Sequence, residues 1–198
     1  MDKDKPDVDE ARSALLRAVN DVNRIDEVIT SVRTMIARQT SEKVLLKLPT
    51  ILNEALALTE RELVSRRISV HYNVPDNVPL VVADRVQLRQ VFVNLIMNAA
   101  EAMDEVVGRD HTLAIAIGND ELEVTITIAD NGSGIDETKR TKIFEPFFTT
   151  KIKGMGLGLA ICKTIIEAHE GRLWTTPNVP SGTIFHLALP LSDKIKIA

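Results

Sequence analysis

The apolar residues of this chain change their spacing near residue 40, and this change divides the 198 residues into two regions. In the first region, spacings of three and four residues alternate along Leu15, Ala18, Val22, Ile25, Ile29, Val32 and Ile36. Such a heptad repeat predicts one long helix over about 9–38 that packs on another helix. An ordinary amphipathic helix lying on the following domain is the alternative. The polar stretch Gln39-Thr40-Ser41-Glu42 ends the helix.

The second region alternates between helical and strand-like patterns. The predicted helices cover Thr50–Arg66, about Arg85–Met103 after a capping box of Asp84 and Gln87, and about Gly156–His169 with a left-handed Gly171 at its end. The predicted strands cover 68–74, half-buried, then 112–117, 121–129, 172–176 and 183–190, with a hairpin turn at Gly118-Asn119-Asp120. This order predicts an α+β fold, with helices layered on one face of a largely antiparallel sheet.

Composition excludes several classes of protein. The formal net charge is −4, with 24 basic and 28 acidic residues interspersed, so no nucleic-acid partner is expected. A single cysteine, Cys162, excludes an intrachain disulfide framework and a cysteine-based zinc cluster. No apolar run approaches the roughly 18–20 residues that cross a bilayer, and the first residues, MDKDKPDVDE, lack the apolar stretch of a signal peptide. We therefore expect a cytoplasmic location.

Two asparagines interrupt the apolar pattern of the predicted helix over 85–103. Asn94, Asn98 and Glu101 follow one another at spacings of four and three residues, which places them on one helical face. A buried amide without a partner costs about 1–3 kcal/mol, so these amides either bond to nearby backbone or face a polar ligand. An asparagine carbonyl is a suitable ligand for Mg²⁺ that phosphates also hold.

Two further segments contain glycines beside polar groups. A predicted strand ends at Asp130, and Gly132 and Gly134 then allow a sharp turn close to a ligand. The carboxylate there can accept a hydrogen bond from an exocyclic amine such as that of adenine, and a plain Asp-Gly turn is the alternative.

The segment Gly154-Met155-Gly156-Leu157-Gly158 opens the last predicted helix, where free backbone N–H groups favour phosphate. It lacks the Lys-Ser/Thr of a P-loop, and Ile161 stands at the third glycine of a dinucleotide fingerprint, so neither of those folds is expected.

Three of the five phenylalanines, Phe144, Phe147 and Phe148, lie just before this segment. We interpret them as a hydrophobic base that carries a mobile lid, from which Lys151 or Lys153 reaches a phosphate. A solvated loop is the alternative for both lysines, and it is favoured for Lys153.

Together these segments resemble the ATP-binding catalytic domain of two-component sensor histidine kinases. The N, G1, F and G2 boxes of that family are matched in order by VFVNLIMNAAEAM, DNGSGI, IFEPFFTTK and GMGLGLAI, and its final box by Ser181-Gly182-Thr183-Ile184-Phe185. The resemblance covers about residues 45–190, and its short lid is similar to that of the nitrogen- and oxygen-sensing subgroup. It implies a Bergerat fold, in which a mixed sheet is backed by helices, and the cofactors ATP and Mg²⁺.

The resemblance also implies a role for each matched residue. Asn98 would coordinate Mg²⁺, and Asn94 would orient a phosphate or a metal-bound water, so that Asn94, Asn98 and Lys151 are the expected catalytic residues. The expected ATP-binding residues are these three together with Asp130, Gly132, Gly134, Ile135, Gly154, Gly156, Leu157, Gly158 and Thr183. In this set Asp130 receives the adenine amine, Lys151 and the glycine-rich segment contact the phosphates, and Thr183 closes the adenine pocket. Glu101 has no secure role.

The residue at the position of Asn94 distinguishes kinases of this fold from ATPases of the same fold that hydrolyse ATP. Gyrase-type, mismatch-repair and heat-shock chaperone ATPases usually carry a glutamate there, as the general base that activates water. An amide cannot accept that proton, so the resemblance implies that ATP is held for transfer to another acceptor.

The histidines of the chain do not match the phosphoacceptor of such kinases. His71, His111, His169 and His186 all lack the His-Glu-x-x-x-Pro-like context. We expect His71 to face solvent, and we expect His169 to lie in the last turn of a helix, where a cation is favoured. The helix over 9–38 resembles the second helix of the dimeric bundle that carries the acceptor. We therefore predict a partial dimerisation and phosphotransfer region over 1–42 and a catalytic ATP-binding domain over 43–198, from a longer kinase whose membrane anchoring is left open.

The resemblance implies transfer of the γ-phosphoryl group of ATP to a histidine outside this chain, for onward transfer to a response-regulator aspartate. The implied partners are the histidine-bearing bundle helix of the full-length kinase, a receiver domain, and a second copy bound weakly through the N-terminal helix. Two alternatives are an anti-sigma-type Ser/Thr kinase of the same fold and a helical dimerisation module with a degenerate nucleotide pocket.

Overall fold

The computed structural model describes residues 42–75, 77–104, 106–151 and 154–192, together with Glu10, Arg12, Ala14 and Leu15. The chain divides into two compact units, Met1–Gln39 and Thr40–Ala198. The four described residues of the first unit are helical, and the rest of the helix predicted over 9–38 lies outside the described residues. Among the described residues, no helix has both the length and the apolar character needed to span a bilayer.

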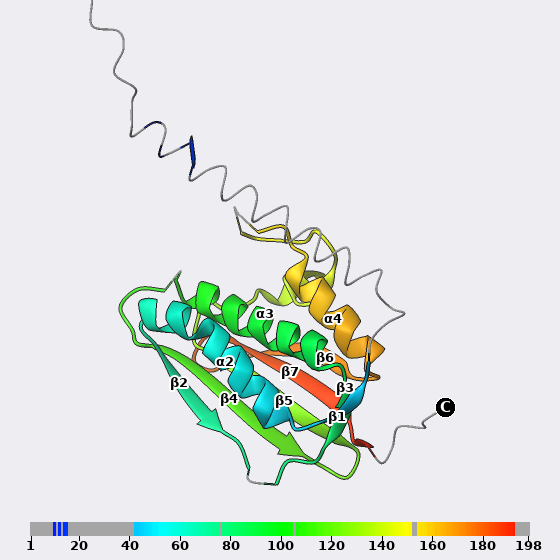
Figure 1. The fold of residues 1–198 in the computed structure, drawn as a ribbon. Coiled ribbons are helices and arrows are strands. Elements are labelled where there is room, and N and C mark those ends of the chain that lie inside the picture. The colour runs from blue at the N-terminus through cyan, green and yellow to red at the C-terminus, as the bar shows by residue number, and fades with distance from the viewer. Residues whose placement is uncertain are drawn as a thin grey trace, which may run out of the picture. The chain divides into compact units, whose positions relative to one another are not determined.

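In the described part of the second unit, three helices cover one face of a five-stranded sheet (Figure 1). The helices are α2 (Leu48–Ser65), α3 (Arg85–Asp104) and α4 (Gly158–Ala168). The strands, in spatial order, are β2 (Ile68–Asn73), β4 (His111–Asn119), β5 (Glu123–Asp130), β7 (Thr183–Pro190) and β6 (Arg172–Pro177). Strands β2 and β4 are parallel and the other neighbours are antiparallel. The predicted α+β fold, with helices on one face of a largely antiparallel sheet, is confirmed.

The core lies between the sheet and the three helices, with α3 at its centre. Alternate residues of the three central strands are buried: Leu113, Ile115, Ile117, Val124, Ile126, Ile128, Phe185, Leu187 and Leu189. They face a helical stripe that includes Leu88, Val91, Phe92, Leu95, Ile96 and Ala99. Because the apolar stripe fixes the rotation of α3, the face with Asn94, Asn98 and Glu101 is only half-buried and stays accessible to a ligand.

Several short elements differ from the prediction. Strands β1 (Val44–Leu46) and β3 (Val81–Ala83) form a separate two-stranded antiparallel sheet that the pattern did not predict. The turn predicted at Gly118-Asn119-Asp120 is wrong, because Gly118 and Asn119 belong to β4. The carboxylate of Asp120 instead accepts the N–H groups of Leu122 and Glu123, at 2.8 and 2.9 Å, and so moves the turn forward along the chain.

Strand β2 is more exposed than its alternating pattern predicted. It lies at the edge of the sheet, and only Ile68 is buried, while Val70 and Tyr72 are 38% and 39% exposed. The helices therefore cover the central strands better than this edge. His71 is exposed, as expected.

The end of α4 also differs from the prediction. The left-handed residue is Glu170, with φ of 59°, rather than Gly171. The N–H of Gly171 donates to the carbonyl of Ile166 at 2.9 Å and that of Glu170 to the carbonyl of Glu167 at 3.0 Å, which is a Schellman ending. A glycine is needed at 171 for another reason, since a Cβ there would lie 2.4 Å from the carbonyl oxygen of Ala188.

His169, which follows α4, joins the end of that helix to the start of α3. Nε2 of His169 accepts the N–H of Asp84 at 2.9 Å, and its Nδ1 bonds to the carbonyl of Ile165 at 2.7 Å. In a capping box the side chain of Gln87 would accept that N–H of Asp84 instead. The side chain of Asp84 accepts the N–H groups of Val86 and Gln87. The expectation of a cation at His169 is wrong, because burial lowers the pKa of this histidine and Nε2 is occupied as an acceptor.

His169→Gln is expected to make folding less sensitive to acid. Because the pKa of His169 is lowered by folding, the unfolded chain takes up its proton first, and the wild type loses stability as the pH falls below about 6.5. The variant should lose this contribution and start about 1–3 kcal/mol less stable at neutral pH, from its altered buried hydrogen bonds. Urea unfolding, followed by the fluorescence of Trp174 at several pH values, measures both effects. The exposed His71→Gln is the control, and a variant with the wild-type acid slope would contradict this role.

Candidate functional site

Three segments that are far apart in the sequence meet along the half-buried face of α3. The N–H of Ser133, in the turn after β5, donates to the carbonyl of Ala102 at 3.1 Å. Lys151 reaches Asn98 from the loop before α4. A Cβ on Gly158, the first residue of α4, would lie 3.9 Å from Nδ2 of Asn94. Helix α3 is therefore the common wall of the candidate site.

Asp130 is a buried carboxylate at the end of β5, with only 1% of its surface exposed. Its Oδ1 accepts the N–H of Gly132 at 2.8 Å and that of Thr183, itself buried, at 3.2 Å. Burial raises the pKa of Asp130, and these hydrogen bonds and the positive charge of Arg109 oppose that rise. The arrangement fixes Oδ1 within the protein and leaves Oδ2 as the oxygen suited to a ligand.

Glycines allow two turns to close around Asp130. Gly182 has φ of +112°, and a Cβ there would lie 2.1 Å from the carbonyl oxygen of Asp130. A Cβ on Gly132 would lie 2.6 Å from the carbonyl oxygen of Ala102 on α3. The close approach that Gly132 permits is therefore to α3, whereas the sequence suggested a ligand. Gly134 has φ of +79° and is followed by the half-buried Ile135.

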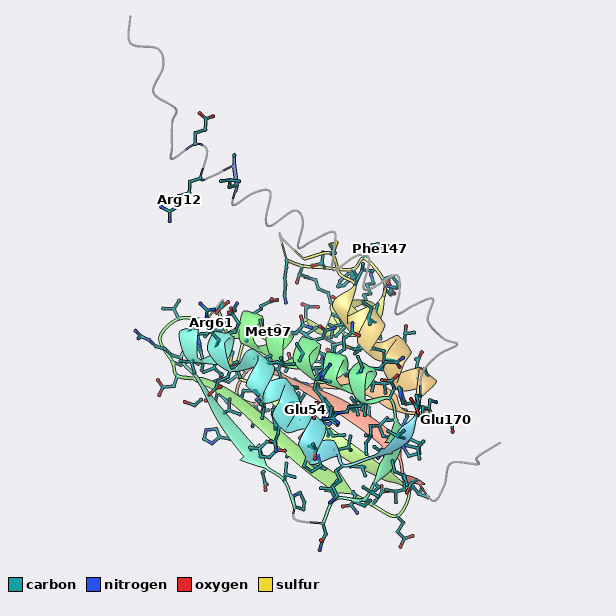
Figure 2. All side chains as sticks on the ribbon, viewed as in Figure 1. Arg12, Glu54, Arg61, Met97, Phe147 and Glu170 are labelled. Carbon is teal, nitrogen blue, oxygen red and sulfur yellow. The ribbon has the colours of Figure 1, made fainter. Side chains whose placement is uncertain are left out.

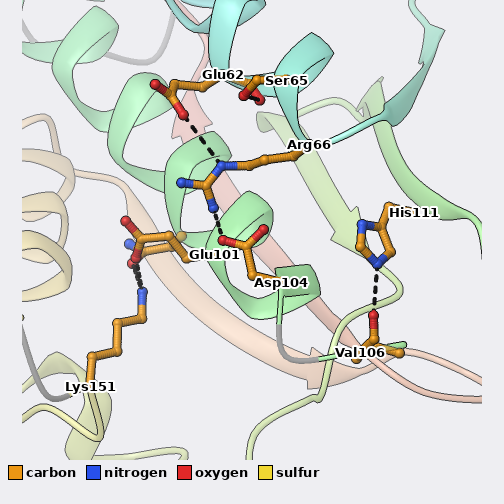
Figure 3. Close-up of polar contacts among 9 residues, drawn as sticks. Glu62, Ser65, Arg66, Glu101, Asp104, Val106, His111 and Lys151 are labelled. Carbon is orange, nitrogen blue, oxygen red and sulfur yellow. Dashed lines mark hydrogen bonds and ion pairs between the residues drawn. The ribbon is translucent and has the colours of Figure 1, made fainter. Parts of the chain in front are cut away.

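Lys151, Asn98 and Glu101 form a polar cluster at the half-buried face of α3. The ammonium of Lys151 donates to Oδ1 of Asn98 at 3.1 Å and forms an ion pair with Glu101 (Figure 3). All three side chains are partly exposed. Glu101 had no secure role in the sequence, and the structure places it with Lys151. The oxygens of Asn98 and Glu101 thus already converge on a positive charge.

A divalent cation fits these oxygen donors. Asparagine carbonyl and carboxylate oxygens are the ligands that Mg²⁺ accepts, and Mg²⁺ is commonly completed by phosphates and water. Among the described residues, no group of three or more His, Cys, Asp or Glu side chains could hold a metal ion. A cation bound at Asn98 would therefore need oxygens from its ligand.

Asn94 faces α4. Its Nδ2 donates to Sγ of Cys162 at 3.7 Å, and Cys162 is fully buried. Burial raises the pKa of the Cys162 thiol to about 12, so this cysteine stays protonated at neutral pH and acts as a packing residue. The structure thus places Asn94 between Asn98, one turn further along α3, and the first turn of α4.

The glycine-rich segment over 154–158 is held by the loop that contains Phe147 and Phe148. The N–H of Phe147 donates to the carbonyl of Gly156 at 3.0 Å, and a Cβ on Gly156 would lie 2.4 Å from the carbonyl oxygen of Phe148. Helix α4 begins at Gly158, two residues after the predicted start, because Gly156 has a left-handed φ of +68°. Leu157 precedes the helix and is buried, and Gly154 lies beside Lys151.

The phenylalanines do not form the expected hydrophobic base. Phe147 is 75% exposed with φ of +66°, and Phe144 and Phe148 are half-buried. Figure 2 shows Phe147 on the loop beside the start of α4. The backbone geometry of this loop, rather than burial of its rings, shapes the segment. Lys153 lies outside the described residues.

Sequence reasoning missed two residues near Asp130, Arg109 and Asn178, and gave no role to a third, Gly182. Asn178 donates to the carbonyl of Asp130 at 2.7 Å, Gly182 packs on the same backbone, and Arg109 donates to the carbonyls of Asn131 and Gly132. No local pattern marks Arg109 or Asn178, whereas Gly182 lies inside the final box that the resemblance named.

Known proteins are similar to this chain over most of its length. The family model of histidine kinase-, DNA gyrase B- and HSP90-like ATPases matches residues 83–193. The chain is 36% identical over 189 residues to the sensor protein FixL of Bradyrhizobium diazoefficiens, which covers 96% of the chain and 37% of FixL. The chain therefore spans little more than a third of that relative.

Solved structures show the same fold. The catalytic domain of histidine kinase ThkA superposes with a TM-score of 0.68 and 33% identity, over 76% of this chain and 98% of that domain. ThkA in complex with response regulator protein TrrA gives a TM-score of 0.78 and 26% identity, over 98% of this chain and 54% of that chain. The second unit therefore has the Bergerat fold.

Asp130→Asn is expected to raise the Tm of the ligand-free protein at neutral pH. Asparagine keeps an acceptor for the N–H groups of Gly132 and Thr183, but it has no charge to remove from water. Because folding raises the pKa of Asp130, wild-type stability falls as the pH rises above its ordinary value of 3.8. In thermal unfolding, the Tm of the variant should therefore exceed that of the wild type by an amount that grows with pH and then levels. Each kcal/mol of difference in the free energy of unfolding corresponds to about 2–4 °C in Tm. A lower Tm for the variant at neutral pH would contradict this balance.

Proposed function

Because the chain belongs to the family of histidine kinase-, DNA gyrase B- and HSP90-like ATPases and carries the ATP-binding catalytic domain of a sensor histidine kinase, we propose that it uses ATP·Mg²⁺ to phosphorylate a histidine outside this chain. The observation that supports this most is the placement of two unlike groups along α3. One side of the proposed site would be the buried acceptor Asp130, and the other would be the polar cluster of Asn98, Glu101 and Lys151.

At the first side, Asp130 would recognise the base. Its Oδ1 is held by two backbone N–H groups, so we assign Oδ2 to the exocyclic amine of adenine. Thr183 and Gly134 border this end of the site and would limit its size. A buried acceptor of this kind discriminates strongly, because a base that presents a carbonyl there would leave the carboxylate unpaired.

At the second side, Asn98 would hold Mg²⁺, which neutralises charge on the phosphates when it is bound. Lys151 would contact the same phosphates and leave Glu101, since a polyphosphate competes with one carboxylate for the ammonium. The backbone N–H groups of Gly156, Leu157 and Gly158, at the start of α4, would bind phosphate oxygens.

The presence of an asparagine at position 94 favours a phosphoryl-transfer function over rapid hydrolysis of ATP. A water molecule that attacks ATP needs a base to accept its proton, and an amide cannot act as one. Asn94 lies beside Asn98 and the first turn of α4, where it would orient the phosphates. The transfer step would then wait for an external acceptor.

The four histidines of this chain are poorly suited as that acceptor. His71, on edge strand β2, is exposed but lacks the His-Glu-x-x-x-Pro-like context. His169 is buried, with its two ring nitrogens bonded to the backbone of Asp84 and Ile165. His111 bonds to the carbonyl of Val106, and His186 stacks on Trp174 and bonds to Thr176. We therefore propose an acceptor on the bundle helix of a longer kinase, with 1–42 as part of that dimerisation region, and a receiver domain as the next partner. ThkA crystallised with the response regulator TrrA is the related case.

Asp130→Asn should abolish selective recognition of adenine. The variant presents an amide N–H₂ where wild type presents Oδ2, so it faces the adenine amine with a donor. We expect ATP affinity to fall about 10- to 150-fold, which corresponds to about 1.5–3 kcal/mol, while GTP affinity does not fall. Calorimetric titration with both nucleotides measures the ratio. Unchanged ATP affinity in a folded variant would refute the assignment of the base to Asp130.

Asn98→Ala should remove the effect of Mg²⁺ on ATP affinity and block phosphoryl transfer. The assay mixes the protein with ATP·Mg²⁺ and a separate histidine-bearing helical bundle from a sensor kinase, and it detects acid-labile phosphate on the bundle. Wild type should label the bundle and the variant should not, and Asn119→Ala, an exposed asparagine of β4, is the control. Phosphate that is acid-stable and found on serine instead would favour the anti-sigma type of kinase.

A further inference from the structure

Arg109, in the loop before β4, connects the two turns that enclose Asp130. Its Nη2 donates to the carbonyl of Gly132 at 2.8 Å and to the carbonyl of Asn131. Its Nη1 donates to the hydroxyl of Ser181. The first two acceptors lie in the turn after β5, and Ser181 lies in the turn between β6 and β7. One side chain therefore ties together segments about fifty residues apart in the sequence.

The backbone around Arg109 is itself fixed to the same turn. Oδ1 of Asn131 accepts the N–H of Thr112 at 2.9 Å, and its Nδ2 donates to the carbonyl of Asp110 at 2.8 Å. Arg109 is exposed. The backbone that follows it, at Asp110 and Thr112, is held by the two ends of the Asn131 side-chain amide. The guanidinium thus starts from a defined position, which lowers the entropy lost when it binds its acceptors.

The turn that contains Ser181 is also held to Asp130 by hydrogen bonds of its own. Asn178 donates its side-chain N–H₂ to the carbonyl of Asp130 at 2.7 Å, and its backbone N–H bonds to the carbonyl of Gly182 at 3.0 Å. Thr183, the next residue, donates to Oδ1 of Asp130. A shift of either turn would therefore move the groups that border the carboxylate.

We propose that Arg109 is a positioning residue for the base-binding end of the site, holding the Gly132 turn and the Ser181 turn at the separation that a purine requires. This inference rests on the proposed binding of adenine at Asp130. The planar fork of arginine reaches acceptors on both turns at once, which a lysine ammonium does not. Arg109 contacts the turns and not the phosphate side, so its effect is confined to the base.

The test compares three ligands in calorimetric titrations: ATP, adenosine and Mg²⁺-tripolyphosphate. In Arg109→Met we expect the affinities for ATP and adenosine to fall by the same factor, about tenfold, with tripolyphosphate unchanged. Arg109→Lys should not restore them. Arg172→Met is the matched control, since Arg172 is also an exposed arginine, but its partner is the carboxylate of Glu123 and not a turn around Asp130.

Wild-type affinity for adenosine in Arg109→Met would overturn the proposal, and so would full recovery in Arg109→Lys. An equal loss for all three ligands would also overturn it, because it would indicate a general disturbance of the fold. Asp130→Asn separates this inference from the proposed function. If that variant loses adenosine and Arg109→Met does not, only the role of Arg109 fails, and if Asp130→Asn has no effect, the base site itself fails.

Discussion

The buried carboxylate of Asp130 constrains the surrounding structure more than any other group. A charge that is removed from water needs hydrogen bonds in return, and the chain supplies them from the backbone of Gly132 and Thr183. Both turns must approach so closely that Gly132 and Gly182 have no room for a Cβ. The geometry at this end of the candidate site thus follows from burying one carboxylate and supplying it with backbone hydrogen bonds.

Much of the fold follows from periodicity. The alternation of apolar residues in β4, β5 and β7 and the helical stripe of α3 are strong local signals, and all four elements form, although β4 runs past its predicted end. Three-residue strands such as β1 and β3 carry too few residues for any period to appear. The hairpin turn was predicted too early in the chain because Gly118 is a common turn residue. In the structure Gly118 belongs to β4, and the turn forms where the side chain of Asp120 accepts the N–H groups of Leu122 and Glu123.

The site was predictable where residue type alone carries chemistry. Asn94 and Asn98 stand out because amides are unfavourable within a helix unless they have partners, and Asp130 because it is a carboxylate at the end of an apolar strand. The glycines stand out because they gather in short segments between the predicted elements. The assigned roles remain proposals. The contacts of Arg109, the pairing of Glu101 with Lys151 and the joint at His169 were not predictable, because each links residues far apart in the sequence and no local pattern records the partner.

The ion pair of Lys151 with Glu101 has a further consequence for how a charged ligand is received. The ammonium draws together the oxygens of Asn98 and Glu101, so the chain's own positive charge orders this corner in advance. In the proposed function, a polyphosphate with its metal would exchange one set of ionic contacts for another and would need little new ordering of side chains. Lys151 would then hold the position of the incoming cation until the ligand replaces its contact with Glu101.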